Sequence, residues 1–347
     1  MKRILAIVLS LTMILSLAAC GKKESSDTPS TESKGKAIKV GVVTDVGGVN
    51  DGSFNQSAWE GLQLAQKELG IEAKYLESKT DADYAPNIET FIDGEYDLII
   101  SVGYMLADAT RTAAEANPDM KFAIIDDSSC ADLPNVTCLM FEQAQASYLV
   151  GIVAGMMTKS NTVGLVLGMS NVTMNEFGYG YLAGVLDANS NATIKQYNAN
   201  AFGDAAVGKS SAVSMITEGA DVIFHAAGGT GLGVIEGCKE NNIWAIGVDS
   251  DQSSLAPKNI ITSAMKRVDI ACYNAVKATI EGNLKNGIIT YDLSSNGVDI
   301  APTTDNLPED VLTAVKDAKA KILSGEITVP KTQADFEAKY GNVYELD

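Results

Sequence analysis

Acidic residues follow three of the apolar runs in this sequence, and they are the side chains best suited to bind a polar ligand. Asp45 follows the run KVGVV, Asp126 and Asp127 follow KFAII, and Asp249 follows WAIGV. If these runs are parallel strands, their carboxyl ends lie at the sheet edge where ligands bind. One carboxylate after a strand is often a helix cap, but two adjacent ones favour a polar ligand. Carboxylates accept strong hydrogen bonds from ligand N–H and O–H groups.

The segment after Asp45, VGGVNDGSFNQSAWEG, adds a glycine turn and an aromatic side chain. Phe54 opens a predicted helix over Phe54–Leu69 beside that turn. Two interpretations stay open for Phe54, which either packs in the core or stacks on a planar ligand. Ser53 is predicted to cap the helix, and Gln56 three residues later would complete a capping box.

A second glycine-rich segment, AAGGTGLG at 226–233, precedes Asp249 and is similar to a dinucleotide fingerprint. Its glycines, at 228, 229, 231 and 233, do not have the spacing G-x-G-x-x-G. The segment also lies in the second half of the chain, and a chain with an export signal is kept away from the nicotinamide pool. We therefore expect no cofactor here, and Gly228 is a candidate for close approach to another ligand.

A histidine and a lysine lie near these segments. His225 is the one histidine of the chain, which disfavours most zinc sites and most histidine-based catalytic pairs. A structural histidine is the favoured interpretation, and contact with a ligand is the alternative. Lys266, in TSAMKRVD, is either a solvated lysine or a cleft lysine that bonds a sugar hydroxyl.

The cysteines of the body give weak signals. They are Cys130, Cys138, Cys238 and Cys272. None forms a C-x-x-C pair, so no metal is expected. A disulfide between Cys130 and Cys138 and separate buried thiols are both open interpretations.

The elements that would position these residues form an α/β pattern. Apolar runs typical of strands buried on both faces occur at Ile38–Val43, Leu98–Val102, Phe122–Ile125, Val163–Leu167, Val222–Phe224 and Trp244–Val248. Helical segments lie between them, among them Phe54–Leu69, Ala107–Ala116, Gln143–Met157 and Val207–Glu218. This alternation predicts doubly wound parallel sheets.

The chain divides into two blocks of similar size, as expected of two lobes that share a cleft. Residues 38–142 plus 266–294 are predicted to form the N-terminal lobe. Residues 143–262 plus 298–347 are predicted to form the C-terminal lobe. The length of 347 residues is consistent with about two domains.

Composition excludes several classes of protein. The net charge is −18, which argues against a nucleic-acid binder because phosphate contacts need clustered Lys and Arg. Apolar residues make up 46% and charged residues 20%, as in a folded globular protein.

The amino terminus carries an export signal. Lys2 and Arg3 precede an apolar run that ends in Leu-Ala-Ala before Cys20, so residues 1–19 are predicted to be a signal peptide. Small residues before a cysteine resemble the lipobox of bacterial lipoproteins, in which that thiol carries a lipid. Residues 20–36, polar and rich in Ser, Thr and Lys, are then a lipidated cysteine and flexible tether. An ordinary signal peptide is the alternative.

Five motifs occur in order: the block from Asp45 to Gln56, then AIIDD, AAGGTG, GVDSDQ and TSAMK. Together they resemble the basic membrane protein family, bacterial substrate-binding lipoproteins of ABC transporters that include purine nucleoside receptors. The resemblance covers nearly all of residues 38–330. It implies the type I periplasmic-binding-protein fold, with two lobes, three crossovers and a closing hinge.

The resemblance also implies a binding site. It places the base between two aromatic rings, Phe54 and either Phe202 or Phe177. Asp126 would read the base edge, with Asp45 and Asn55 nearby. The ribose would be held by the Gly228 region, Asp249 and Lys266. In much of the family a more apolar residue stands where this chain has His225.

The function implied is binding and delivery. The expected ligand is a purine nucleoside (adenosine, guanosine or inosine), and the expected partners are a permease and an ATPase on separate chains. A monomer anchored by a lipid on Cys20 at the extracytoplasmic face of the bacterial membrane is expected. Alternatives are another planar ligand such as riboflavin, a surface sensor or adhesin, and, less favoured, an enzyme acting on nucleosides.

Overall fold

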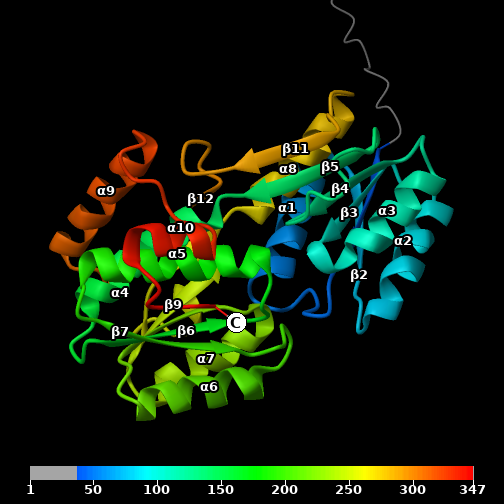
Figure 1. Cartoon of the computed structure of the whole chain (residues 1–347). Coiled ribbons are helices and arrows are strands. Elements are labelled where there is room, and N and C mark those ends of the chain that lie inside the picture. Colours follow the sequence, from blue (N-terminus) through cyan, green and yellow to red (C-terminus); the bar gives the residue numbers. More distant parts are fainter. Residues whose placement is uncertain (1–36, 347) are drawn as a thin grey trace, which may run out of the picture. The chain divides into compact units, whose positions relative to one another are not determined.

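Strands and helices alternate along residues 37–346, the part of the chain that the computed structural model describes (Figure 1). The predicted signal peptide, the lipidated Cys20 and the tether lie outside the described residues. Residues from Ala37 onward form one compact unit.

The first of two six-stranded sheets contains most strands of the first half of the chain. Its strands are β1 (Lys39–Val43), β2 (Glu72–Leu76), β3 (Leu98–Val102), β4 (Lys121–Ile125), β5 (Val136–Phe141) and β11 (Gly287–Tyr291). Their order across the sheet is β11-β5-β4-β3-β1-β2, and every neighbouring pair is parallel.

The second sheet repeats this order with later strands. Its strands are β6 (Thr162–Leu167), β7 (Thr193–Asn198), β8 (Val222–Ala226), β9 (Trp244–Asp249), β10 (Ile260–Lys266) and β12 (Val298–Ile300). The order is β12-β10-β9-β8-β6-β7, and only the β10–β12 pair is antiparallel among the described residues. The α/β fold class is therefore confirmed.

Helices connect the strands and cover the sheets (Figure 1). They are α1 (Phe54–Leu69), α2 (Tyr84–Asp93), α3 (Ala107–Ala116), α4 (Gln143–Met157), α5 (Val172–Ala188), α6 (Ala205–Thr217), α7 (Gly228–Glu240), α8 (Val268–Ile280), α9 (Glu309–Leu323) and α10 (Gln333–Tyr340). Helix α8 packs against α1, and α4 packs against α5 and α9. Short 3₁₀ turns occur at Asp81–Asp83, Tyr104–Leu106 and Ser253–Leu255. Within residues 37–346, no helix is long and apolar enough to span a membrane.

The chain passes between the sheets three times, after β5, after β10 and after β11. We call the first sheet, with the helices and loops that connect its strands or pack on them, the first lobe, and the second sheet with its helices and loops the second lobe. The finer lobe boundaries, 38–142 plus 266–294 and 143–262 plus 298–347, remain a prediction.

The strand order places a ligand site. In each sheet, β1 and β3, or β6 and β8, are neighbours from which the chain winds in opposite directions. Ligands bind in doubly wound folds outside the carboxyl ends of the strands at such a switch point. A ligand site is therefore expected at the loops after β1, β3, β4, β8 and β9.

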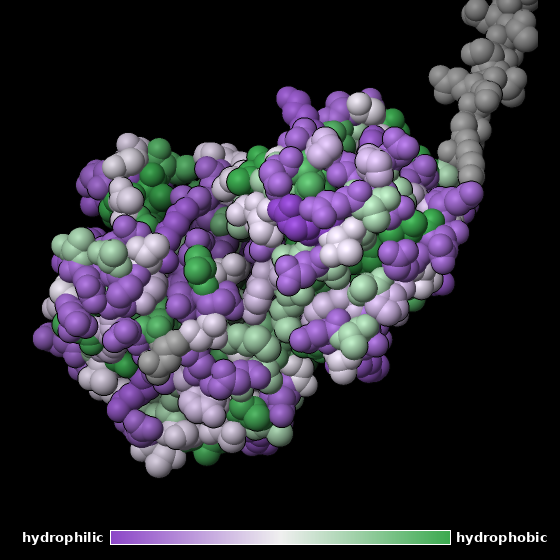
Figure 2. All heavy atoms as spheres, turned by 45° about the vertical axis from the view of Figure 1, so that its right-hand side comes forward, coloured by the Kyte–Doolittle hydropathy of each residue, from purple (hydrophilic) through white to green (hydrophobic). Residues whose placement is uncertain are grey.

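Figure 2 shows hydrophilic residues over much of one face, with hydrophobic residues in scattered small groups. The core consists of the buried apolar strand residues and the inner faces of the helices.

Candidate functional site

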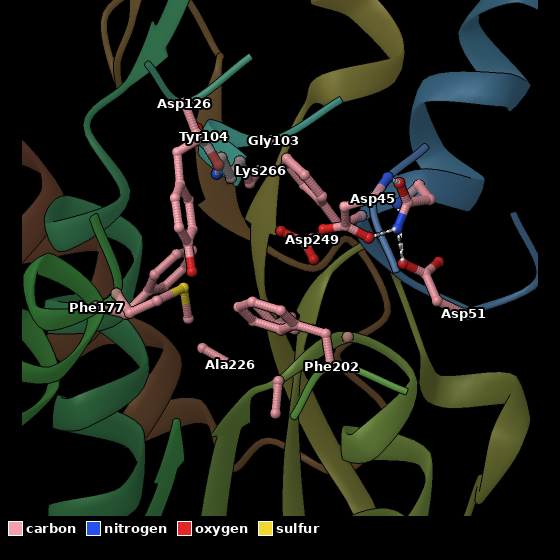
Figure 3. A pocket seen from close by; sticks show the side chains of 16 residues that line it. Asp45, Asp51, Gly103, Tyr104, Asp126, Phe177, Phe202, Ala226, Asp249 and Lys266 are labelled. Atoms are coloured by element: carbon pink, nitrogen blue, oxygen red, sulfur yellow. Dashed lines mark hydrogen bonds and ion pairs between the residues drawn. The ribbon is translucent and has the colours of Figure 1, made fainter. Parts of the chain in front are cut away.

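One cavity, with an empty volume of about 480 Å³, lies between the carboxyl ends of the two sheets (Figure 3). It is lined by all nine predicted ligand-binding residues: Asp45, Phe54, Asn55, Asp126, Phe177, Phe202, Gly228, Asp249 and Lys266. Their role in binding remains a prediction, but the structure brings them to one place.

Two of the carboxylates stand on unusual backbone. Asp126 follows β4 with φ 65°, and Asp249 ends β9 with φ 63°. The left-handed conformation is uncommon for residues other than glycine and often marks functional sites. Here it turns the backbone sharply at the end of each of these two strands and leaves both carboxylates beside the cavity.

Asp45 is fixed by a network within the first lobe. Its Oδ1 accepts hydrogen bonds from the Asn55 Nδ2 at 2.7 Å and the Gly47 amide at 2.8 Å. Burial raises the pKa of Asp45 to about 6, although the bond from Asn55 opposes the increase. Asn55 also bonds Asp51, so its amide is oriented from two sides (Figure 3).

The helix that carries Phe54 is capped by Asp51 instead of Ser53. The Asp51 carboxylate accepts from the backbone amides of Ser53, Asn55 and Gln56 at 2.9–3.0 Å. Ser53 occupies the N-cap position as predicted, but its hydroxyl makes no cap bond, so the predicted side-chain cap and its box with Gln56 are wrong. The Asp51 carboxylate, two residues earlier, accepts hydrogen bonds from the free amides at the start of the helix. The Ser53 hydroxyl is then available to another partner.

That partner is Asp249 of the second lobe, whose Oδ2 accepts from the Ser53 hydroxyl. Asp249 is only 5% exposed. Burial raises its pKa to about 7, with the nearby Lys266 ammonium acting in the opposite direction. Asp249 thus links the two lobes and adds an acceptor to the cavity wall.

Lys266 and Asp126 form a buried ion pair between the ends of β10 and β4. The pair joins the lobes, since β10 belongs to the second sheet. The Lys266 ammonium also lies 4.8, 5.1 and 5.4 Å from the ring centroids of Phe54, Phe141 and Phe177. The solvated interpretation of Lys266 is therefore wrong, because the residue is 1% exposed. The Oδ1 of Asp126 is buried without a protein partner and is available to a ligand donor.

Aromatic rings form the apolar walls. Tyr104 of the first lobe and Phe177 and Phe202 of the second are labelled in Figure 3, and Phe54 of the first lobe also lines the cavity. The carbonyl of Phe202 accepts from the Thr230 amide at 3.0 Å, which ties this residue to the first turn of α7. Both candidates for the second stacking ring line the cavity, so the choice between them stays open.

His225 lies behind the cavity wall, which its neighbours Ala226 and Ala227 line. The ring is fully buried, and its Nε2 lies 3.1 Å from the Oε1 of Gln252. Burial lowers the pKa of His225 to about 4, so the imidazole is neutral at physiological pH. This geometry agrees with the structural interpretation of His225.

Sequence reasoning missed Tyr104, Asp51 and Met174, which also line the cavity. Tyr104 had a usable signal, because Gly-Tyr directly follows the strand Leu98–Val102, as Asp45 nearly follows the first strand. Its hydroxyl accepts from the Asn171 Nδ2 of the second lobe at 2.8 Å. Met174, within helix α5, had no such signal.

The remaining groups give little chemistry. All four cysteines of the described chain are buried free thiols, so the alternative of a disulfide between Cys130 and Cys138 is not observed. Burial raises the pKa of Cys238 to about 12, which keeps that thiol unreactive. No cluster of metal-binding side chains occurs among residues 37–346.

Two doubly wound sheets around one cavity define the type I solute-binding proteins. A solved solute-binding protein of an ABC transporter from Aeropyrum pernix K1 superposes with a TM-score of 0.80 and 29% identity. The match covers 88% of this chain and 98% of that one. The class is one of binding proteins, not of enzymes.

The chain belongs to the Bmp family, described as "ABC transporter substrate-binding protein PnrA-like", whose profile matches residues 38–333. A relative from Listeria innocua, "CD4+ T-cell-stimulating antigen", is 40% identical over 93% of this chain and 98% of its own length. The "ABC transporter nucleoside-binding protein BmpA" of Lactococcus lactis is 36% identical over 95% and 99%. The predicted family is therefore confirmed.

Proposed function

We propose that this substrate-binding protein captures one purine nucleoside in the cavity and delivers it to an ABC permease. The observation that carries the proposal is the combination of aromatic walls with a buried, unpartnered carboxylate oxygen on Asp126. Aromatic rings stack on any base, so discrimination must come from the polar groups. The Lactococcus lactis relative, named a nucleoside-binding protein, supports the same ligand class.

Each polar group has a role in this proposal. Asp126 accepts an N–H of the base through its free Oδ1. Asp249 accepts from the ribose hydroxyls, and Lys266 donates to them with the hydrogens that its ion pair leaves free. Asp45, held by Asn55, provides a second acceptor on the first lobe.

Charge favours the nucleoside over its phosphate ester. Asp45, Asp51, Asp126 and Asp249 line the cavity, whereas its one cationic side chain, Lys266, is already paired with Asp126. A phosphate group would add negative charge to this environment without an unpaired partner. We therefore expect nucleosides to bind and their 5′-monophosphates to be rejected.

Delivery follows from closure. Ligand contacts from both lobes favour the closed form, and the closed form is then recognised by the permease. We further propose that the protein acts at the extracytoplasmic face of the membrane, held by a lipid on Cys20. Mass spectrometry of membrane-extracted protein tests for the lipid on Cys20. As a second test, the Cys20→Ala variant should be released into the medium.

Calorimetry on the chain from residue 37 onward, unfolded and refolded to remove carried-over ligand, tests the ligand. The panel is adenosine, guanosine, inosine, uridine, ribose, guanosine 5′-monophosphate and riboflavin. Purine nucleosides should bind while ribose and the monophosphate give no heat. Heat from riboflavin alone would move the function to another planar ligand. Heat from none of them would favour the sensor or adhesin role.

A further inference from the structure

Outside the cavity, the lobes are joined directly at Gly52. Its carbonyl accepts from the Nε2 of Gln252 at 2.9 Å and from the Ser250 hydroxyl at 3.3 Å. Ser250 and Gln252 belong to the second lobe and line a separate groove, not the cavity. These bonds therefore need no contact with a ligand in the cavity.

The Gln252 side chain is oriented without ambiguity. Its Oε1 accepts from the Val248 backbone amide at 3.0 Å, and a backbone amide can only donate. The amide nitrogen must then point away from Val248, toward Gly52. The backbone amide of Gln252 also donates to the Ser263 hydroxyl at 3.2 Å, which fixes the base of the side chain.

His225 also helps to orient the Gln252 side chain, through a hydrogen bond to its Oε1. Because the Gln252 Oε1 is an acceptor, the His225 Nε2 at 3.1 Å must carry the hydrogen. Its Nδ1 is then a bare acceptor, and it is buried without a partner. The ring fits only because α7 has Gly231 here, where a Cβ would lie 2.0 Å from Nδ1.

The other half of the contact is equally fixed. Gly52 has φ 65°, and a Cβ at this position would lie 3.1 Å from Leu232 of the second lobe. The Asp51 carboxylate holds the turn through three backbone amides. A rigid carbonyl on one lobe therefore meets a preset donor on the other, which lowers the entropy lost on contact.

We propose that Gln252, oriented by His225, is a latch that holds the two lobes closed independently of ligand. Gln252 makes the contact, and His225 is a positioning residue that acts through it. The latch stabilises the form in which the cavity is enclosed, so it also slows ligand release; this second part rests on the proposed function.

The test measures the closed fraction without ligand. All four native cysteines of the described chain are buried, so dyes can be placed on Asp93→Cys of the first lobe and Glu236→Cys of the second. Single-molecule energy transfer then reports the separation of the lobes. Gln252→Met should lower the closed-to-open ratio roughly threefold to tenfold, the effect of losing one hydrogen bond. Gln196→Met, which removes a bond to Glu345 within the second lobe, is the matched control and should change nothing.

Further variants separate a latch from a general loss of packing. Ser250→Ala, at a half-buried position, should shift the ratio in the same direction by a smaller factor. His225→Phe should lower the ratio in the wild-type background but have no further effect on it in Gln252→Met. Circular dichroism and thermal unfolding verify that each variant is folded.

Equal closed fractions in the wild type, Gln252→Met and Ser250→Ala would overturn the latch. The kinetic consequence is tested with guanosine, whose dissociation from Gln252→Met should be faster by the same factor. Association should be no slower than in the wild type, because more of the ligand-free variant is open. Failure of guanosine to bind the wild type would remove the proposed ligand but leave the ligand-free measurement decisive for the latch.

Discussion

Replacement of Asp249 by asparagine should stabilise the ligand-free protein at neutral pH while it weakens ligand binding. Burial raises the pKa of Asp249 to about 7 from 3.8. For an acid, a raised folded-state pKa means that stability is fully present below the unfolded pKa. It is then lost as pH rises through the folded pKa. At pH 8 the ionised carboxylate would then cost up to about 4 kcal/mol of unfolding free energy, at about 1.4 kcal/mol for each pKa unit.

The Asp249→Asn variant removes this cost without removing the lobe contact, since the side-chain amide oxygen can still accept from the Ser53 hydroxyl. The variant should therefore exceed the wild type in unfolding free energy at pH 8. The difference should shrink by about 3 kcal/mol between pH 8 and pH 5, because the wild-type carboxyl becomes protonated in the folded state over that interval.

The assay is urea unfolding of ligand-free protein at a series of pH values, because bound ligand would stabilise the folded state by itself. Asp119→Asn, at an exposed carboxylate, is the control and should follow the wild type at every pH. Two results would refute the conclusion that the buried, ionised Asp249 carboxylate lowers the free energy of unfolding. One is a variant no more stable than the wild type at pH 8, and the other is a stability difference that does not change with pH. Calorimetry on the same variant should show weaker nucleoside binding.

Three further predictions concern single residues. Phe54→Ala should lose about 1–3 kcal/mol of nucleoside binding free energy, because stacking is lost. Its melting temperature should change little, because the ring is only partly buried. Unchanged affinity by calorimetry would remove Phe54 from the site. Asp51→Ala should lower the free energy of unfolding by about 1–2 kcal/mol, because three amides at the start of α1 lose their acceptor. Asp81→Ala is the control and should be nearly neutral. Urea unfolding measures both free energies. Of Phe177→Leu and Phe202→Leu, the one that lowers affinity more in the same calorimetric titration is the second stacking ring, and equal, full affinity in both would contradict an aromatic sandwich.

Six of the eight inner strands of the two sheets were predicted from the sequence, for a physical reason. Strands covered on both faces need apolar residues at nearly every position, and such runs are conspicuous. The edge strands β2, β7 and β11 were missed because their residues are half-exposed and alternate in character. The inner strands β5 and β10 were also missed although they are buried, because VTCLMF includes Thr and Cys and IITSAMK includes Thr, Ser and Lys.

Candidate site residues were predictable where strand ends supply them. A polar residue after an apolar run is visible in sequence, and this rule led to Asp45, Asp126 and Asp249. The partners of those residues were less visible. The bond between Ser53 and Asp249 and the ion pair of Lys266 with Asp126 join positions 196 and 140 residues apart.

The error at Ser53 shows how local rules fail at a site between lobes. Ser53 and Asp51 are both acceptable caps for α1, and a capping rule selects the residue next to the helix. The structure uses Asp51 instead, so the Ser53 hydroxyl and the Gly52 carbonyl are both available to the second lobe. The Asp51 carboxylate therefore performs two tasks. It caps the start of the helix that carries Phe54, and it fixes the turn through which the lobes meet. The block from Asp45 to Gln56 follows from this logic: its acids and amides hold a turn in one conformation, and that conformation serves the cavity on one side and the lobe contact on the other.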